Sequence, residues 1–316
     1  MNLLMSRRLP DSVMSEAEAC FHVTCRATTL PMDHGDCVAA LEAYDLIVPT
    51  LGDAFTAQAF DAAGQPRCKL LANFGVGYNH IDVPAARAAG VAVTNTPGAV
   101  TDATADIAMT LILMTARRAG EGERLVRAGQ WTGWHPTQML GLHVTGKTVC
   151  VIGMGRIGQA IARRCHFGFG CRILYVNRSA KQVDFPAEQR DMADALGQAD
   201  IVVLATPGGA ETYHLIGADA FAAMQPDAIF ANISRGDVVD ETALIDALQT
   251  RQIAGAGLDV YEHEPAVPQA LRVMDQVTLL PHLGTAALEV REAMGRMALA
   301  NCIAVSEGRA PPNPVP

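Results

Sequence analysis

The segment 147–165, KTVCVIGMGRIGQAIARRC, limits the possible folds more than any other part of the chain. Its apolar start is typical of a buried strand, and QAIARRC is typical of a helix. They are joined by a G-x-G-x-x-G motif whose expected binding positions are Gly153, Gly155, Arg156, Ile157 and Gly158. The first glycine allows a tight turn, the second lets a phosphate approach the backbone, and the third lets the helix pack closely on the strand. The free N–H groups at the start of such a helix favour anions. The segment therefore predicts a dinucleotide-binding α/β unit.

Strand-like and helix-like segments alternate on both sides of this motif, which indicates parallel sheets with helices on their faces. From Lys147 onward, the apolar runs predicted to be strands are 147–153, 172–177, 200–207, 228–234, 254–260 and 277–282. Six strands with intervening helices predict a Rossmann-type doubly wound parallel sheet. Nearer the N-terminus, the predicted strands are 45–51, 68–75 and 91–98. The helix-like segments 56–64 and 82–90 each end at a glycine, a common helix stop.

The chain of 316 residues has room for two domains. We expect residues 100–285 to form the dinucleotide-binding domain. Residues 1–99 are expected to form a smaller α/β domain, completed by a helix in residues 286–316. An apolar connecting helix is predicted at 102–118, and an arm or loop that holds both tryptophans is predicted at 119–146.

Charge and cysteine content argue against several kinds of partner. The net charge of −9 repels phosphate backbones and anionic lipid, so neither nucleic acid nor a membrane is expected as a partner. No apolar run approaches the roughly 20 residues of a membrane helix, and no signal peptide is recognisable. The eight cysteines include no C-x-x-C pair, so we expect reduced thiols, a cytoplasmic location and no metal site.

The residues after the second strand of the dinucleotide domain bear on which dinucleotide binds. Enzymes that use NAD usually place Asp or Glu there to bind the ribose hydroxyls. This chain has Asn177, Arg178 and Ser179, then Lys181, and its first carboxylate is Asp184. Amide, hydroxyl and cationic groups can bind a 2′-phosphate, which a carboxylate would repel. We therefore expect NADPH to be preferred, with NADH possible if Arg178 only stacks on adenine.

A cation, acids and an imidazole follow three of the predicted strands. Arg235 comes after AIFANIS, Asp259 and Glu264 lie in LDVYEHEP, and His282 comes after VTLL. Open α/β sheets bind ligands at the carboxyl ends of their strands, so these side chains are expected to converge there. Such a group can hold an anion and transfer a proton.

These motifs resemble the D-isomer-specific 2-hydroxyacid dehydrogenase family. The resemblance rests on GMGRIGQAIARR, NISRGDVVD, GLDVYEHEP and PHLGTA, with support from NFGVGYNHIDV and NTPGAVTDATAD. The segment GQWTGWHP is similar to the tryptophan segment of the glyoxylate/hydroxypyruvate reductase branch. The resemblance implies an NAD(P)-dependent oxidoreductase that reduces a small 2-oxo acid to the D-2-hydroxy acid. It also implies that the smaller domain is flavodoxin-like and binds the substrate.

The resemblance assigns roles to individual residues. His282 would donate the proton to the substrate carbonyl, Glu264 would orient that imidazole, and Arg235 would hold the substrate carboxylate. The backbone of Val76 and Gly77 would bind the same carboxylate. Asp259 would contact the nicotinamide carboxamide, and the other expected cofactor-lining positions are Thr104, Thr206, Pro207 and Ile233.

The tryptophan segment carries an expectation about assembly. By resemblance, the chain forms a homodimer in which Trp134 reaches the substrate pocket of the partner subunit. Two alternatives to glyoxylate or hydroxypyruvate reduction remain open at this point. One is reduction of another 2-oxo acid within the same family, and the other is a non-catalytic NAD(P)-sensing protein on the same fold.

Overall fold

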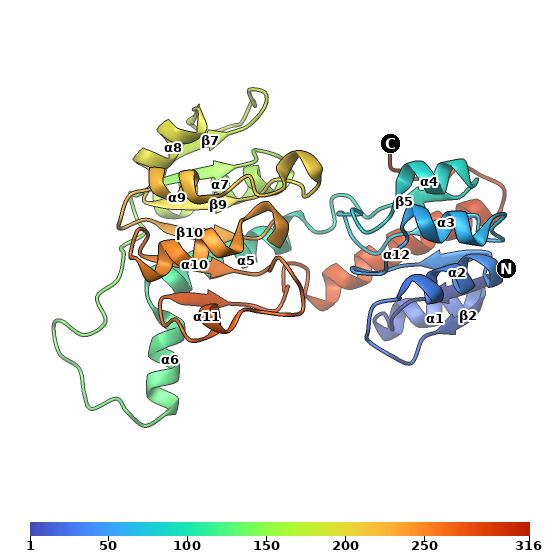
Figure 1. Cartoon of the computed structure of the whole chain (residues 1–316), viewed down its shortest axis with the longest axis horizontal. Coiled ribbons are helices and arrows are strands. Elements are labelled where there is room, and N and C mark those ends of the chain that lie inside the picture. Colours follow the sequence, from blue (N-terminus) through green and yellow to red (C-terminus); the bar gives the residue numbers. More distant parts are fainter. The chain divides into compact units, whose positions relative to one another are not determined.

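The computed structural model describes residues 1–316 and divides them into two compact units (Figure 1). The first unit contains residues 1–100 and 285–316, and the second contains residues 101–284. Each boundary lies one residue from the one expected from the sequence. No helix is both long and apolar enough to cross a membrane.

The first unit contains a five-stranded parallel sheet with the order β2-β1-β3-β4-β5. Its strands are β1 (Asn2–Met5), β2 (His22–Cys25), β3 (Leu46–Val48), β4 (Leu70–Ala72) and β5 (Ala92–Thr94). This is the flavodoxin-like strand order. The strands stay parallel, but after β2 is added on one side of β1, the strands that follow are added on the other side. The predicted flavodoxin-like fold is therefore confirmed. Strands β1 and β2 were not identified from the sequence.

Helices cover both faces of this sheet. One face packs against α1 (Asp11–Cys20) and α12 (Leu288–Ser306). The other packs against α2 (His34–Ala43), α3 (Ala57–Ala63) and α4 (Val83–Ala88). The contact of α12 with α1 is close, because a Cβ added at Gly295 would lie 2.7 Å from a methyl carbon of Val13. The last helix of the chain is thus built into the core of the first unit.

The second unit contains a seven-stranded parallel sheet with the order β12-β11-β10-β9-β6-β7-β8. Its strands are β6 (Thr148–Ile152), β7 (Arg172–Val176), β8 (Ala187–Gln189), β9 (Ile201–Leu204), β10 (Ile229–Asn232), β11 (Gly255–Leu258) and β12 (Val277–Leu279). The order reverses between β6 and β9, as in the doubly wound dinucleotide fold, which confirms the predicted fold class. The six predicted strands are present, and β8 adds a short edge strand that was not expected.

Two cores pack on the two faces of this second sheet. One contains α5 (Thr101–Ala116) and α7 (Arg156–Phe169). The other contains α8 (Met192–Gln198), α9 (Ala218–Ala223), α10 (Glu241–Gln249) and α11 (Gln269–Arg272). Helix α5 is the predicted apolar helix, and it packs so closely that a Cβ at Gly257 would lie 2.8 Å from the hydroxyl oxygen of Thr115.

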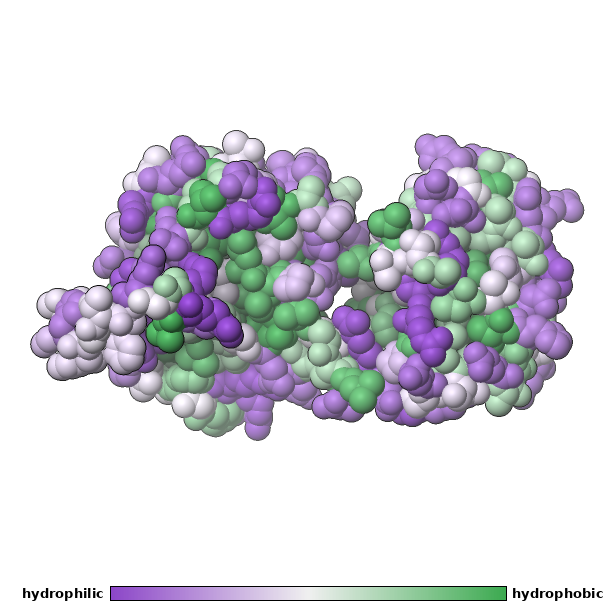
Figure 2. Space-filling view, turned by 90° about the horizontal axis from the view of Figure 1, so that it is seen from below, coloured by the Kyte–Doolittle hydropathy of each residue, from purple (hydrophilic) through white to green (hydrophobic).

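The segment 119–146 differs from the expected arm or loop, because it begins with the helix α6 (Ala119–Arg127). None of the α6 residues is buried in the single chain, so no core contact marks this helix in the way that it marks most of the others. Ion pairs along its surface, such as Arg118 with Glu121 and Arg127 with Glu123, accompany the helix instead. The extended residues after it project from the second unit at the left of Figure 2 and carry mostly pale side chains of intermediate hydropathy.

Candidate active site

The glycine motif forms the turn between β6 and α7. Gly153 has φ +99°, and a Cβ there would lie 2.8 Å from the carbonyl of Ala205. A Cβ at Gly158 would overlap the carbonyl oxygen of Gly153. The protein's own packing therefore requires both glycines.

Gly155 is different, because a Cβ there would meet no protein atom within 4 Å. It is the N-cap of α7, a helix of 14 residues. Arg156 and Ile157 are the first residues of this helix, and N–H groups in a first helical turn have no partner within the helix. Open space beside a helix N-terminus fits the pyrophosphate of a dinucleotide, so the residues present suit this cofactor.

The loop after β7 contains the residues expected to bind the adenosine ribose. The side chain of Asn177 is used within the protein: its Oδ1 accepts the Met154 N–H at 3.2 Å, and its Nδ2 donates to the Ser179 carbonyl at 2.8 Å. Asn177 therefore joins this loop to the glycine motif. Arg178 projects into solvent and pairs with Glu211, with 2.8 Å between Nη1 and Oε2. Glu211 was not identified from the sequence, because 33 residues separate it from Arg178.

The four further positions expected to line the cofactor lie at carboxyl ends of strands or on α5. Thr206 and Pro207 follow β9, and the buried hydroxyl of Thr206 has no partner in the protein, which leaves it available to a ligand. Ile233 follows β10 and is buried. Thr104 on α5 donates its hydroxyl to the Gly284 carbonyl at 3.2 Å.

His282 and Glu264 form the expected pair. The Nδ1 of His282 lies 2.9 Å from the Oε2 of Glu264, while the Oε1 of Glu264 accepts the Tyr261 N–H at 3.1 Å. Burial alone would raise the pKa of Glu264, but the hydrogen bond and charge of His282, the Tyr261 N–H and the charge of Arg235 together lower it. The pair thus combines an ionised carboxylate with an imidazole whose Nε2 remains free for a substrate.

Asp259 holds the turn that presents His282. His282 has φ +56°, a left-handed conformation that costs a non-glycine residue about 1–2 kcal/mol. Its N–H bonds to the Asp259 carbonyl at 2.9 Å. The carboxylate of Asp259 accepts the N–H groups of Leu283 at 2.6 Å and Gly284 at 2.8 Å. Burial raises the pKa of Asp259, and these two N–H groups oppose the increase.

Arg235 follows β10 in a tightly packed loop. A Cβ at the next residue, Gly236, would overlap the backbone of Tyr261, so this loop is locked against the loop after β11. The Nη1 of Arg235 donates to the Ser234 carbonyl at 2.7 Å, while its buried Nε has no partner in the protein. Burial lowers the pKa of Arg235, although Glu264 and Asp237 oppose this. An arginine remains charged at neutral pH, so a buried donor is available for an anion.

In the first unit, Val76 and Gly77 lie in the loop after β4, and their N–H groups make no hydrogen bond within the protein. The carbonyls of this loop are held instead: Asn73 Nδ2 donates to Gly75 and Gly77 at 3.0 Å each, and Asn95 Nδ2 donates to Val76 at 2.9 Å. The two asparagine side chains thus bind the carbonyls of the loop, while its amides stay free. Free backbone N–H groups in a loop suit the binding of an anion. Neither asparagine was identified from the sequence.

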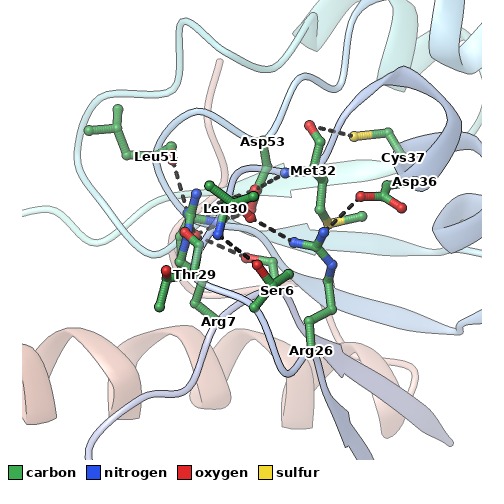
Figure 3. A network of polar contacts seen from close by, with 12 residues as sticks. Ser6, Arg7, Arg26, Thr29, Leu30, Met32, Asp36, Cys37, Leu51 and Asp53 are labelled. Carbon is green, nitrogen blue, oxygen red and sulfur yellow. Dashed lines mark hydrogen bonds and ion pairs between the residues drawn. The ribbon is translucent and has the colours of Figure 1, made fainter. Parts of the chain in front are cut away.

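A second polar network, shown in Figure 3, fixes the neighbouring loop after β3. Asp53 is fully buried and accepts the N–H groups of Met32 at 2.8 Å and Thr50 at 2.7 Å. Arg7, which follows β1, points toward this loop and donates to the Leu51 carbonyl at 3.0 Å. The network determines the shape of the loop that carries Leu51. It too was not recognised from the sequence, because its partners lie far apart in the chain.

Trp134 lies in the projecting segment with 78% of its surface exposed, and Trp131 is 53% exposed. Within a single chain, neither tryptophan contacts Arg235, Glu264 or His282. The role of Trp134 in a partner subunit therefore stays a prediction.

A doubly wound dinucleotide unit with an arginine and a glutamate–histidine pair at the carboxyl ends of its strands defines a nicotinamide-dependent dehydrogenase. Residues 109–284 match the family described as D-isomer specific 2-hydroxyacid dehydrogenase, NAD binding domain. The chain belongs to this family and is an enzyme that uses a nicotinamide dinucleotide.

Similar proteins are known from several organisms. A glyoxylate reductase from Thermococcus onnurineus is 41% identical over 317 residues, which cover 98% of this chain and 94% of the relative. A glyoxylate reductase from Thermococcus kodakarensis is 46% identical over 275 residues, covering 85% and 82% of the two chains. The solved structure of an NADPH-dependent glyoxylate/hydroxypyruvate reductase from Sinorhizobium meliloti, in complex with NADP and malonate, has a TM-score of 0.88 and 34% identity. That match covers 99% of this chain and 96% of the other.

Proposed function

We propose that this enzyme reduces glyoxylate or hydroxypyruvate to the corresponding 2-hydroxy acid, the D isomer in the case of hydroxypyruvate, and that it prefers NADPH. The observation that carries the proposal is the pairing of His282 Nδ1 with Glu264 at 2.9 Å, beside the partly buried Arg235 with its unpaired Nε. The names of the relatives support the substrate class.

The residues of the site divide the chemistry among them. The bound cofactor supplies a hydride to the carbonyl carbon of the 2-oxo acid. His282 gives a proton from Nε2 to the carbonyl oxygen, while Glu264 holds the imidazole by its other nitrogen and stabilises its charged form. Arg235 binds the substrate carboxylate through its fixed donors. The free amides of Val76 and Gly77 are assigned to the same carboxylate, and Asp259 to the carboxamide of the nicotinamide.

The preference for NADPH rests on the loop after β7. Arg178, Ser179 and Lys181 offer donors to a 2′-phosphate, and the nearest carboxylate along the chain, Asp184, is paired with Arg163. NADH lacks the phosphate and therefore forms no ion pair with these donors. NADH is therefore expected to work less efficiently.

The exposed tryptophan segment supports a homodimer. Residues 126–137 are all exposed in the single chain, including both tryptophans. Large exposed apolar side chains that gather in one segment mark an interaction site, and a second copy of this chain is the partner we propose. Sedimentation equilibrium of the purified protein measures this assembly.

The test of the function is oxidation of NADPH and of NADH with glyoxylate, hydroxypyruvate, pyruvate and a phenyl-substituted 2-oxo acid. We expect the highest kcat/KM with glyoxylate or hydroxypyruvate and NADPH. The His282→Ala variant should lose roughly 10²–10⁴-fold in kcat while binding NADPH normally, because general acid catalysis contributes about that much. A higher kcat/KM for the phenyl substrate would assign another substrate within the family. Tight NADPH binding without any turnover would favour a sensor.

A further inference from the structure

Two loops flank the glycine motif in the second unit. Strand β6 lies between β7 and β9 in the sheet, so the loop after β7 and the loop after β9 lie on either side of the motif at its carboxyl end. Arg178 belongs to the first of these loops and Glu211 to the second, and their side chains meet at 2.8 Å. The ion pair therefore links the two walls of the adenosine end of the proposed cofactor site.

The backbone places both partners. The Thr212 hydroxyl donates to the carbonyls of Pro207 at 2.8 Å and Gly209 at 3.2 Å. Gly209 has φ +138°, a conformation that only glycine adopts readily, so the turn that carries Glu211 is specified by the sequence. On the other side, three hydrogen bonds hold Asn177, which precedes Arg178. The pair is thus presented by two anchored loops.

The pair is easy to break. Arg178 and Glu211 have exposed side-chain fractions of 90% and 83%, and such exposed pairs contribute little to stability. A 2′-phosphate carries about two negative charges against one on a carboxylate, and it can accept two parallel bonds from one guanidinium, whereas Glu211 accepts a single bond from Arg178. A nucleotide with a 2′-phosphate can therefore displace Glu211, whereas one with a 2′-hydroxyl has no charge with which to do so.

We propose that Glu211 competes with the 2′-phosphate of NADPH for Arg178 and thereby limits the preference for NADPH over NADH. This inference rests on the proposed binding of the 2′-phosphate by Arg178. It makes Glu211 a specificity-determining residue that weakens the binding of the preferred cofactor. While the dinucleotide without the phosphate is bound, the ion pair stays closed.

The experiment measures Kd for NADPH, NADH, 2′,5′-ADP and 5′-AMP by calorimetry in five proteins. These are the wild type, Glu211→Gln, Arg178→Ala, the double variant and Glu16→Gln. The last is a matched control, because Glu16 is also exposed and pairs with an arginine, Arg296 at 2.9 Å, but lies on α1 in the first unit. It removes the same charge without touching the cofactor loops.

We expect Glu211→Gln to tighten binding of NADPH and 2′,5′-ADP about two- to fivefold, the range that an exposed ion pair can contribute. The same substitution should change the Kd for NADH and 5′-AMP by less than this factor. Arg178→Ala should weaken NADPH about tenfold or more, because it removes a charged hydrogen bond. In the Arg178→Ala background, Glu211→Gln should have no further effect, and Glu16→Gln should change nothing.

The outcomes separate this inference from the proposed function. If Arg178→Ala weakens NADPH binding but Glu211→Gln leaves it unchanged or weakens it, competition by Glu211 is wrong and the NADPH preference stands. If Arg178→Ala leaves NADPH binding unchanged, the phosphate is bound elsewhere and both proposals fall. An equal gain with Glu16→Gln would show that net charge, and not the ion pair, is responsible.

Discussion

The loop after β4 in the first unit and the loop after β6 in the second both offer backbone N–H groups to an anion, but they free these groups in different ways. In the loop after β6, the amides are free because they begin the 14-residue helix α7. In the loop after β4, the side chains of Asn73 and Asn95 hold the carbonyls, and the amides of Val76 and Gly77 are left without partners. Regular secondary structure frees the amides of one loop, and side-chain hydrogen bonds free those of the other.

This difference determines how each site responds to substitution. The donors of a helix N-terminus belong to the backbone and need no side chain to orient them, so an atom placed in the path of the ligand can block the site without unfolding it. A loop held by two asparagines loses its shape when either asparagine loses its amide group. Substitutions can therefore show whether the two loops work in these two ways.

The largest effect is expected from Gly155→Ala in the loop after β6. The added methyl meets no protein atom within 4 Å, so the protein should fold normally, but it occupies the space assigned to the pyrophosphate. We expect NADPH and NADH affinities to fall together by roughly 10–100-fold, equivalent to about 1.4–2.8 kcal/mol. KM for the 2-oxo acid, measured at saturating cofactor, should not change.

Gly168→Ala is the matched control for this variant. Gly168 lies on the same helix α7, and a Cβ there also meets nothing within 4 Å. It should leave both affinities unaltered. Normal cofactor binding by Gly155→Ala would show that the pyrophosphate does not approach this residue.

A smaller effect is expected from Asn73→Ala in the loop after β4. The substitution removes both hydrogen bonds to the carbonyls of Gly75 and Gly77, so the loop's amides lose their fixed orientation. We expect KM for the 2-oxo acid to rise about tenfold, the equivalent of one or two hydrogen bonds, with cofactor affinity unchanged.

Asn73 is buried, so the stability of the variant must be measured together with its KM. Asn95 is less buried and holds the same loop, so Asn95→Ala provides a second variant. Its side chain holds only the Val76 carbonyl, and a rise in KM of a few-fold is expected. An unchanged KM in both folded variants would remove the loop after β4 from substrate binding.

The smallest effect concerns pH, because backbone amides do not titrate in the accessible range and the Glu264 carboxyl does. The pKa of Glu264 lies below its ordinary value of 4.5. A carboxylate with a lowered pKa stabilises the fold fully above that ordinary value, and the stabilisation disappears as pH falls through the lowered pKa. The difference in Tm between wild type and Glu264→Gln should therefore be constant near neutral pH and shrink below about pH 4.5. A difference that grows on acidification would contradict the lowered pKa.

Much of the fold was predictable, because central strands are apolar on both faces. The strands β6, β9 and β10 consist almost entirely of buried residues, so each is a conspicuous apolar run. The edge strands β2 and β8 are not: their side chains are exposed or only partly buried. Edge strands pair on one side only and need no continuous apolar run, which accounts for these two omissions. It does not account for β1, an interior strand with three buried residues that was also missed.

The site was predictable to the extent that it consists of charged side chains after apolar strands. Arg235, Glu264 and His282 stand out for that reason, and the structure places all three at the same edge of one sheet. Residues that act on the backbone give no such signal. Asn73 and Thr212 do their work through hydrogen bonds to carbonyls, and no spacing rule distinguishes them from other polar loop residues.

The position of α12 in the first unit has a consequence for the order in which the protein is made. The face of the first sheet that includes Leu3 and Met5 is covered partly by α12, which is synthesised after the whole of the second unit. The second unit, 101–284, is continuous, and domains generally fold as units during synthesis. The cofactor-binding unit can therefore complete its core first, while the unit begun earlier keeps an apolar face open until α12 has been synthesised.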